Sequence, residues 1–206
     1  MRAADKNAWM VFLVLLLAAT LAHGGGPLGI DHRWNMDDAG IWKRSNQNVL
    51  RYGSLIGDIG FAAWEGGESR LGKTAWQSID AVSGSGLVAE SAKRVFGRPR
   101  PRDNPDPNQW SKGGRSFPSG EVTEISAIIT PYVLEYRHEQ PAVWALELLP
   151  AYDALARMKV QAHWQTDVLA GFALGTAAAY FAHERDNPFV LSVLPGGVAV
   201  GVKKRF

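Results

Sequence analysis

The 206-residue chain contains no cysteine. Disulfide bonds and thiolate metal sites are therefore excluded. The formal net charge of +2 is too small to indicate nucleic acid as the main partner. Long apolar runs are also scarce: the most apolar internal stretch, 168–181, is shorter than the ~20 residues that a bilayer-crossing helix needs. These absences favour one domain that is soluble or peripheral to a membrane, without a nucleic-acid partner.

The N-terminus has the layout of a secretory signal. Arg2 and Lys6 precede a short apolar run, 9–22, and small residues follow it. A basic region, a short apolar region and small residues are typical of a signal peptide. An uncleaved N-terminal anchor is the alternative interpretation. In either case we expect residues 1–24 to be a targeting segment and the rest of the chain to be exported, to the periplasm or the cell envelope.

The remaining chain has mainly helical patterns. Between 41 and 64 apolar residues recur at helical spacing, but glycines interrupt the pattern and predict two helices or one kinked helix. Further helices are expected over 73–96, 119–136, 142–156 and 163–183. Residues 189–202, with a Pro-Gly-Gly turn, predict a small C-terminal β-hairpin. The fold class is therefore all-α, a bundle of about five or six helices with a hairpin tail.

One stretch combines groups that suit phosphate chemistry. His163 and Asp167 are four residues apart, so on a helix they would share one face. A carboxylate beside an imidazole can fix its tautomer and leave the other ring nitrogen free as a nucleophile. Arg157, upstream, adds a permanent cation with donors suited to phosphate. A His–Asp pair is also common on solvated helix faces, so this stretch is not specific by itself.

Two upstream segments carry the matching chemistry. Lys93 and Arg100 supply two further cations, and Ser119 and Gly120 fall where a helix is expected to begin. Backbone N–H groups and the positive end of the helix dipole favour an anion at such a point. The neighbouring arginines are expected to be solvated or to attract an anionic substrate; these are Arg94, Arg98 and Arg102.

Together, these segments resemble the phosphatidic acid phosphatase type 2 superfamily, which includes bacterial class A acid phosphatases, lipid phosphatases and vanadium haloperoxidases. Its pattern is Lys-x6-Arg-Pro, then Pro-Ser-Gly-His, then Ser-Arg-x5-His-x3-Asp. The matching residues, in order, are Lys93, Arg100 and Pro101; Pro118, Ser119 and Gly120; and Arg157, His163 and Asp167. On this resemblance we expect residues 25–187 to form the phosphatase-like domain, with 188–206 as its tail.

Two residues depart from the family pattern. Ala156 replaces a serine, and Glu121 replaces the histidine that protonates the leaving group. Glutamate is favoured in the first turn of a helix, so Glu121 has an ordinary structural explanation. The alternative is that Glu121 takes over as the general acid, although a helix dipole and nearby cations would lower its pKa.

The resemblance implies hydrolysis of a phosphomonoester without a metal or other cofactor. His163 would be the nucleophile, Asp167 its orienting partner and Glu121 the acid. The remaining matched residues would bind the phosphate: Lys93, Arg100, Ser119, Gly120 and Arg157. The substrate would be a lipid phosphate or a small phosphoester, and peripheral membrane contact is expected. A lipid-linked phosphotransferase, or a non-catalytic phosphate- or lipid-binding relic, would retain most of these residues; a haloperoxidase would need the missing histidine.

Overall fold

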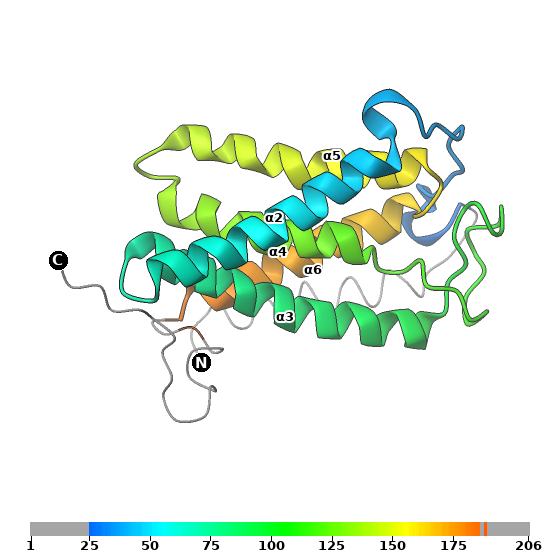
Figure 1. The fold of residues 1–206 in the computed structure, drawn as a ribbon. Helices are drawn as coiled ribbons and strands as arrows, with labels where there is room; N and C mark the ends of the chain where they lie inside the picture. Colours follow the sequence, from blue (N-terminus) through cyan, green and yellow to red (C-terminus); the bar gives the residue numbers. More distant parts are fainter. Residues whose placement is uncertain (1–24, 186–187, 189–206) are drawn as a thin grey trace.

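The computed structural model describes residues 25–185 and 188, and its described part is a bundle of five α-helices without a β-strand. Figure 1 shows their arrangement. The helices are α2 (Arg44–Glu65), α3 (Arg70–Phe96), α4 (Gly120–Tyr136), α5 (Leu148–Lys159) and α6 (Gln165–His183). Short 3-10 helices are η1 (Pro27–Gly29), η2 (Gly40–Trp42) and η3 (Pro141–Glu147). The all-α prediction is confirmed for these residues, whereas the signal segment and the hairpin lie outside them.

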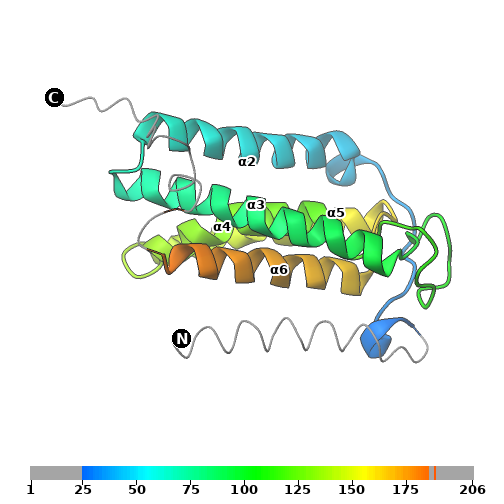
Figure 2. The same cartoon turned by 90° about the horizontal axis from the view of Figure 1, so that it is seen from below.

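Helix α4 is the centre of the bundle. It packs most extensively against α6 and α3, while α2 lies at the edge (Figure 2). Most of its side chains are buried, including Ile125, Ile128 and Val133. A helix that is apolar over most of its surface must be covered over most of it, which explains its central place.

Two glycines of α6 allow it to lie close to α4. A Cβ atom on Gly171 would come 2.5 Å from the backbone oxygen of Ser119, and one on Gly175 would come 2.3 Å from that of Thr123. Neither distance is tolerable between non-bonded atoms, so any side chain there would push the helices apart. The contact holds the start of α4 against the start of α6, which is where the predicted motifs meet.

Helix α3 is continuous over the range 73–96 expected from the sequence and begins slightly earlier, at Arg70. It runs through Ser83–Gly86, and the hydroxyl of Ser85 donates back to the carbonyl oxygen of Ala81 at 2.6 Å. Ser69 caps its start by accepting a hydrogen bond from Gly72 N at 2.9 Å. Gly97 ends it in the left-handed conformation, with φ of 51°. Lys93 is thereby placed in the last turn.

Helix α2 is likewise a single helix, but several of its apolar residues face outward while polar residues face the interior. The apolar residues at helical spacing, Val49, Tyr52, Ile56 and Ile59, are exposed. Its buried residues include Gln47 and Asp58 instead. The region expected as a helix over 142–156 is also different, because η3 occupies its first half and α5 begins only at Leu148.

Three segments outside the α-helices gather at one end of the bundle (Figure 1). They are residues 25–43, the loop 97–119 and the turn 160–164. Backbone hydrogen bonds join them, including Asp37 N to Lys159 O at 3.0 Å and Arg102 N to Gln161 O at 3.1 Å. Over the described part of the chain, no helix has the length and apolar character needed to cross a membrane.

Candidate active site

The three predicted motifs converge at this end of the bundle around a cavity of about 250 Å³. Five of the predicted site residues line it: Lys93, Arg100, Gly120, Glu121 and His163. The other three are buried just outside the lining: Ser119, Arg157 and Asp167. The sequence-predicted residues are therefore brought together, although not all of them face the cavity.

His163 lies in the turn before α6, not on the helix as its spacing from Asp167 suggested. Its Nδ1 atom is 2.7 Å from the backbone oxygen of Ser116. A carbonyl oxygen can only accept, so Nδ1 carries the proton and Nε2 keeps its lone pair. Burial lowers the pKa of His163 to about 4, despite the neighbouring carboxylate of Asp167, so the ring is neutral near pH 7. The result is an unprotonated nitrogen at the cavity wall.

Asp167 occupies the third position of α6 and folds back over the helix start. Its Oδ2 atom accepts hydrogen bonds from Trp164 N at 2.9 Å and from the hydroxyl of Ser116 at 2.5 Å. The same oxygen is 3.9 Å from Nδ1 of His163, which is too long for a hydrogen bond. Asp167 therefore reaches His163 through its charge and through Ser116, whose carbonyl holds the ring.

Arg98 is fully buried, so the expectation that it is a solvated charge is wrong. It donates to Asp31 at 2.6 Å and to Asp167 at 2.7 Å, and the rings of Trp110 and Trp164 lie 4.5 and 5.4 Å from its guanidinium carbon. Two carboxylates and flanking aromatic faces provide the compensation that a buried guanidinium requires. Arg98 thus binds Oδ1 of Asp167, whereas Ser116 binds Oδ2.

Lys93 and Arg100 are the cations available to an anion in the cavity. The three acids of the lining, Glu90, Glu121 and Glu124, each pair with an arginine. Across the described residues, no carboxylate lies within ion-pair distance of Lys93 or Arg100. Burial lowers the pKa of both groups, because their charges are partly desolvated. An anion placed between them would supply the missing counter-charge.

Gly120 brings the start of α4 against Lys93. A Cβ atom at Gly120 would lie 2.4 Å from Nζ of Lys93, so only glycine leaves room for the ammonium group in its present place. Ser119 is the residue before the helix, as predicted, and its buried hydroxyl has no hydrogen-bond partner within the described structure. Gly120 thus lies where the positive end of the α4 dipole meets the cavity, and Ser119 is the buried residue before it.

Glu121 is engaged by a residue that the sequence analysis did not identify. Arg44 of α2 donates to both of its carboxylate oxygens, at 2.6 and 2.8 Å, and Arg157 lies 3.5 Å away. Burial opposes ionisation of Glu121, but the bonds from Arg44 and the charges of Arg157 and Arg44 outweigh it and lower its pKa to about 2. In this arrangement Glu121 is an ionised ion-pair partner that holds no proton to donate.

Arg157 is buried beside the cavity. One guanidinium nitrogen donates to Oε1 of Gln47 at 2.9 Å, while Nε has no partner among the described atoms. Burial lowers its pKa to about 10, against the raising effect of Glu121.

On the same helix, one turn earlier, the buried carboxylate of Asp153 also lacks a hydrogen-bond partner within the described structure. Burial and the charge of Glu121 raise the pKa of Asp153 to about 7.

A second arginine of α2 completes the wall. Arg51 donates to both oxygens of Glu124, with Nη2 at 2.7 Å from Oε2. Arg44 and Arg51 are two turns apart and face Glu121 and Glu124, which are one turn apart on α4. The sequence feature that could have indicated these two arginines is the polar stripe of α2. The apolar residues of this helix are more numerous and obscured that stripe. These two bidentate pairs join α2 to the start of α4.

The family model of the PAP2 superfamily matches residues 75–188. Lipid A 1-phosphatase of Rhizobium johnstonii is 33% identical over 98 residues, which are 44% of this chain and 39% of the relative. Lipid A 1-phosphatase of Rhizobium etli is 33% identical over 98 residues, or 44% of this chain and 41% of the relative. The chain thus matches about two fifths of the length of these relatives. No solved structure matches.

Proposed function

Because the chain belongs to the PAP2 superfamily, we propose that it hydrolyses a phosphomonoester through a phosphohistidine on His163. The observation that carries this proposal is the hydrogen bond of 2.7 Å between His163 and the Ser116 carbonyl. It leaves Nε2 unprotonated at the wall of a cavity that is also lined by Lys93 and Arg100, neither of which has an ion-pair partner among the described residues. A neutral imidazole beside an anion site is the arrangement that nucleophilic attack on phosphorus requires.

In the proposed reaction, Lys93 and Arg100 bind the phosphate oxygens and neutralise their charge. Nε2 of His163 forms a bond to phosphorus as the bond from phosphorus to the leaving oxygen breaks. Water then cleaves the phosphohistidine and releases inorganic phosphate. Asp167, at 3.9 Å, stabilises the positive charge that the ring acquires in the intermediate. No metal or other cofactor takes part in the proposal.

We assign Glu121 a positioning role in preference to the acid role that its place in the motif suggests. Its pKa of about 2 and its two hydrogen bonds to Arg44 favour the ionised form. The leaving oxygen then takes its proton from water, unless the leaving group is stable as an anion. Arg157 and Ser119 lie outside the cavity lining and would support the phosphate site indirectly. Arg157 would do so by its charge, and Ser119 by its hydroxyl, which has no hydrogen-bond partner among the described residues.

A lipid phosphate is the substrate class we propose. Two relatives are named lipid A 1-phosphatases, and their similarity supports a lipid phosphate over a small soluble phosphoester. We further propose that the protein works at the cell envelope after export, with residues 1–24 as signal or anchor. The sequence pattern of that segment is the support for this location. Residues 25–187 would then be the catalytic domain and 188–206 its tail.

The test is a screen of the purified full chain against lipid phosphates and soluble phosphoesters, with and without EDTA. Hydrolysis insensitive to EDTA and trapping of labelled phosphate on His163 are the expected results. His163→Ala should lose both, while Lys159→Ala, a control at the last residue of α5 and outside the cavity lining, should retain them. Transfer of label to an added alcohol in place of water would indicate a phosphotransferase. Binding of phosphate without turnover or label would refute the enzyme proposal.

A further inference from the structure

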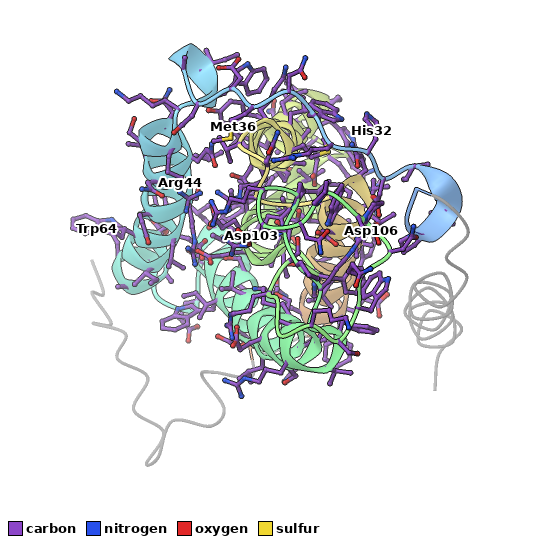
Figure 3. All side chains as sticks on the ribbon, turned by 90° about the vertical axis from the view of Figure 1, so that its right-hand side faces the viewer. His32, Met36, Arg44, Trp64, Asp103 and Asp106 are labelled. Carbon is purple, nitrogen blue, oxygen red and sulfur yellow. The ribbon has the colours of Figure 1, made fainter. Side chains whose placement is uncertain are left out.

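The outer face of α2 carries an unusual set of exposed apolar side chains. Four of them, Val49, Tyr52, Ile56 and Ile59, recur at the spacing of one helical stripe. Ile56 is 69% exposed and Trp64, at the far end of the helix, is 87% exposed. Figure 3 shows Trp64 projecting away from the bundle, whereas Arg44 at the other end lies against it. We call this stripe, from Val49 to Trp64, the α2 outer face.

No exposed charge interrupts this face. Between residues 49 and 64 the charged residues are Arg51 and Asp58, and both point inward. Arg51 pairs with Glu124, and Asp58 accepts hydrogen bonds from Ser78 and Tyr132 in the interior. The uncharged length is about 24 Å at the usual rise per residue. Solvated helix faces normally carry charged residues, so a face of this kind indicates a contact.

The α2 outer face continues from the candidate active site. The cavity is lined by Arg51 of α2 and by Val82 and Gly86 of α3, so both helices contribute to its wall. Leu87, next to Gly86, is 74% exposed and is a further exposed apolar side chain, on α3. A cationic cavity thus borders on an uncharged apolar surface. A molecule with a phosphate head and hydrocarbon tails presents the same two chemistries side by side.

We propose that the α2 outer face, with Leu87, docks on a lipid leaflet and contacts its hydrocarbon. The cavity would then lie at the level of the headgroups, where a lipid phosphate reaches it without leaving the leaflet. The choice of a membrane as the occupant rests on the proposed lipid phosphatase function and on the continuity between cavity and face. The other candidate occupant is a second copy of the chain, because Gly53 and Gly57 have open space around them.

The first experiment measures flotation of the full chain with vesicles of phosphatidylcholine and phosphatidylglycerol, neither of which is a phosphomonoester. The wild type is expected to float with the vesicles. Ile56→Asp should lower the bound fraction about tenfold or more, since it places a charge in the hydrocarbon contact. Leu169→Asp is the matched control, because Leu169 is an apolar residue of α6 that is 52% exposed and lies off this face. Its binding should equal that of the wild type.

The second measurement separates this proposal from the enzymatic one. Hydrolysis of soluble p-nitrophenyl phosphate by Ile56→Asp should remain at the wild-type rate, while hydrolysis of phosphatidic acid in vesicles should fall with binding. Vesicle binding that depends on Ile56 in a protein without any phosphatase activity would support the docking face and refute the enzymatic function. A chain that hydrolyses soluble phosphoesters but does not bind vesicles would overturn the docking proposal. So would self-association in sedimentation velocity that Ile56→Asp abolishes without any vesicle binding.

Discussion

The Nδ1 atom of His163 lies 2.7 Å from the carbonyl oxygen of Ser116, closer than to any oxygen of Asp167. The backbone, and not the carboxylate, therefore determines the tautomer of the candidate nucleophile. Ser116 is also the residue whose hydroxyl binds Asp167. A single serine thus connects the acid to the ring through two different atoms, and this arrangement has a measurable consequence.

Asp167→Asn should leave the proton of His163 on Nδ1. The Ser116 carbonyl still accepts it, so nitrogen NMR should show the same tautomer in the variant and the wild type. Turnover should fall about 10- to 100-fold, because a negative charge next to the phosphohistidine is lost. A change of tautomer in the variant would show that Asp167 orients the ring directly.

The rate should depend on pH through His163. Only the neutral ring attacks phosphorus, and burial lowers its pKa to about 4. We therefore expect kcat/KM to rise as the pH passes about 4. It should then stay level up to neutral pH, because the His163 ring is already neutral in that range. The measurement is a pH–rate profile with p-nitrophenyl phosphate. An acidic limb centred near the ordinary value of histidine would contradict the burial argument.

Glu121→Gln tests the positioning role of Glu121. The substitution removes the charge that holds Arg44 and Arg157, so turnover should fall by a similar factor for alkyl phosphates and for p-nitrophenyl phosphate. If Glu121 were the general acid, the alkyl phosphates would lose much more, because the p-nitrophenolate leaving group needs no proton. Glu124→Gln, which disrupts the neighbouring Arg51 pair, is the matched control for loss of an α2–α4 contact.

Gly120→Ala should weaken phosphate binding with little effect on folding. The added methyl group would displace the ammonium of Lys93, which is the flexible end of a side chain and can move away. We expect KM for phosphoesters to rise about tenfold while Tm changes by only a few degrees. Lys93→Met should show the same rise in KM. An intact KM in Gly120→Ala would remove Lys93 from the phosphate site.

Asp153→Asn should stabilise the protein at high pH. The pKa of Asp153 is raised to about 7 from 3.8, so the folded state keeps a proton that the unfolded state loses. Wild-type stability therefore falls as the pH rises from about 4 to about 7, and the Asn variant lacks this loss. At pH 8 the variant should be more stable by on the order of 4 kcal/mol, with little difference at pH 4. Urea unfolding at the two pH values provides the measurement.

Much of the site could be predicted from the sequence because its motifs are short and local. Lys93, Gly120 and His163 stand at the last turn of one helix, the first turn of another and a turn before a third, and their order indicated a common family. The geometry around His163 could not be predicted in the same way. Four-residue spacing suggested one helical face, but α6 begins only at Gln165, so the carbonyl of Ser116 takes the place of Asp167.

Long-range pairing accounts for the residues that were missed. Arg44 meets Glu121 across 77 positions of sequence, and Arg98 meets Asp31 across 67. No periodicity reports such a contact, and charged side chains are read as solvated by default. Helix α2 could not be oriented from the sequence for a similar reason. The spacing of its apolar residues identifies an apolar stripe, but it does not show whether that stripe packs against the rest of the protein or faces outward.

The buried position of Asp31 extends the functional unit beyond the segment recognised by homology. The family match begins at residue 75, yet Asp31 supplies one of the two carboxylates around Arg98. Two carboxylates and one guanidinium leave a net charge of −1 next to the ring that would become cationic in the proposed phosphohistidine. A fragment cut at the homology boundary would lose that excess negative charge while keeping every motif residue. The minimal unit that could be transplanted or expressed with this charge balance therefore includes Asp31 as well as the motif residues.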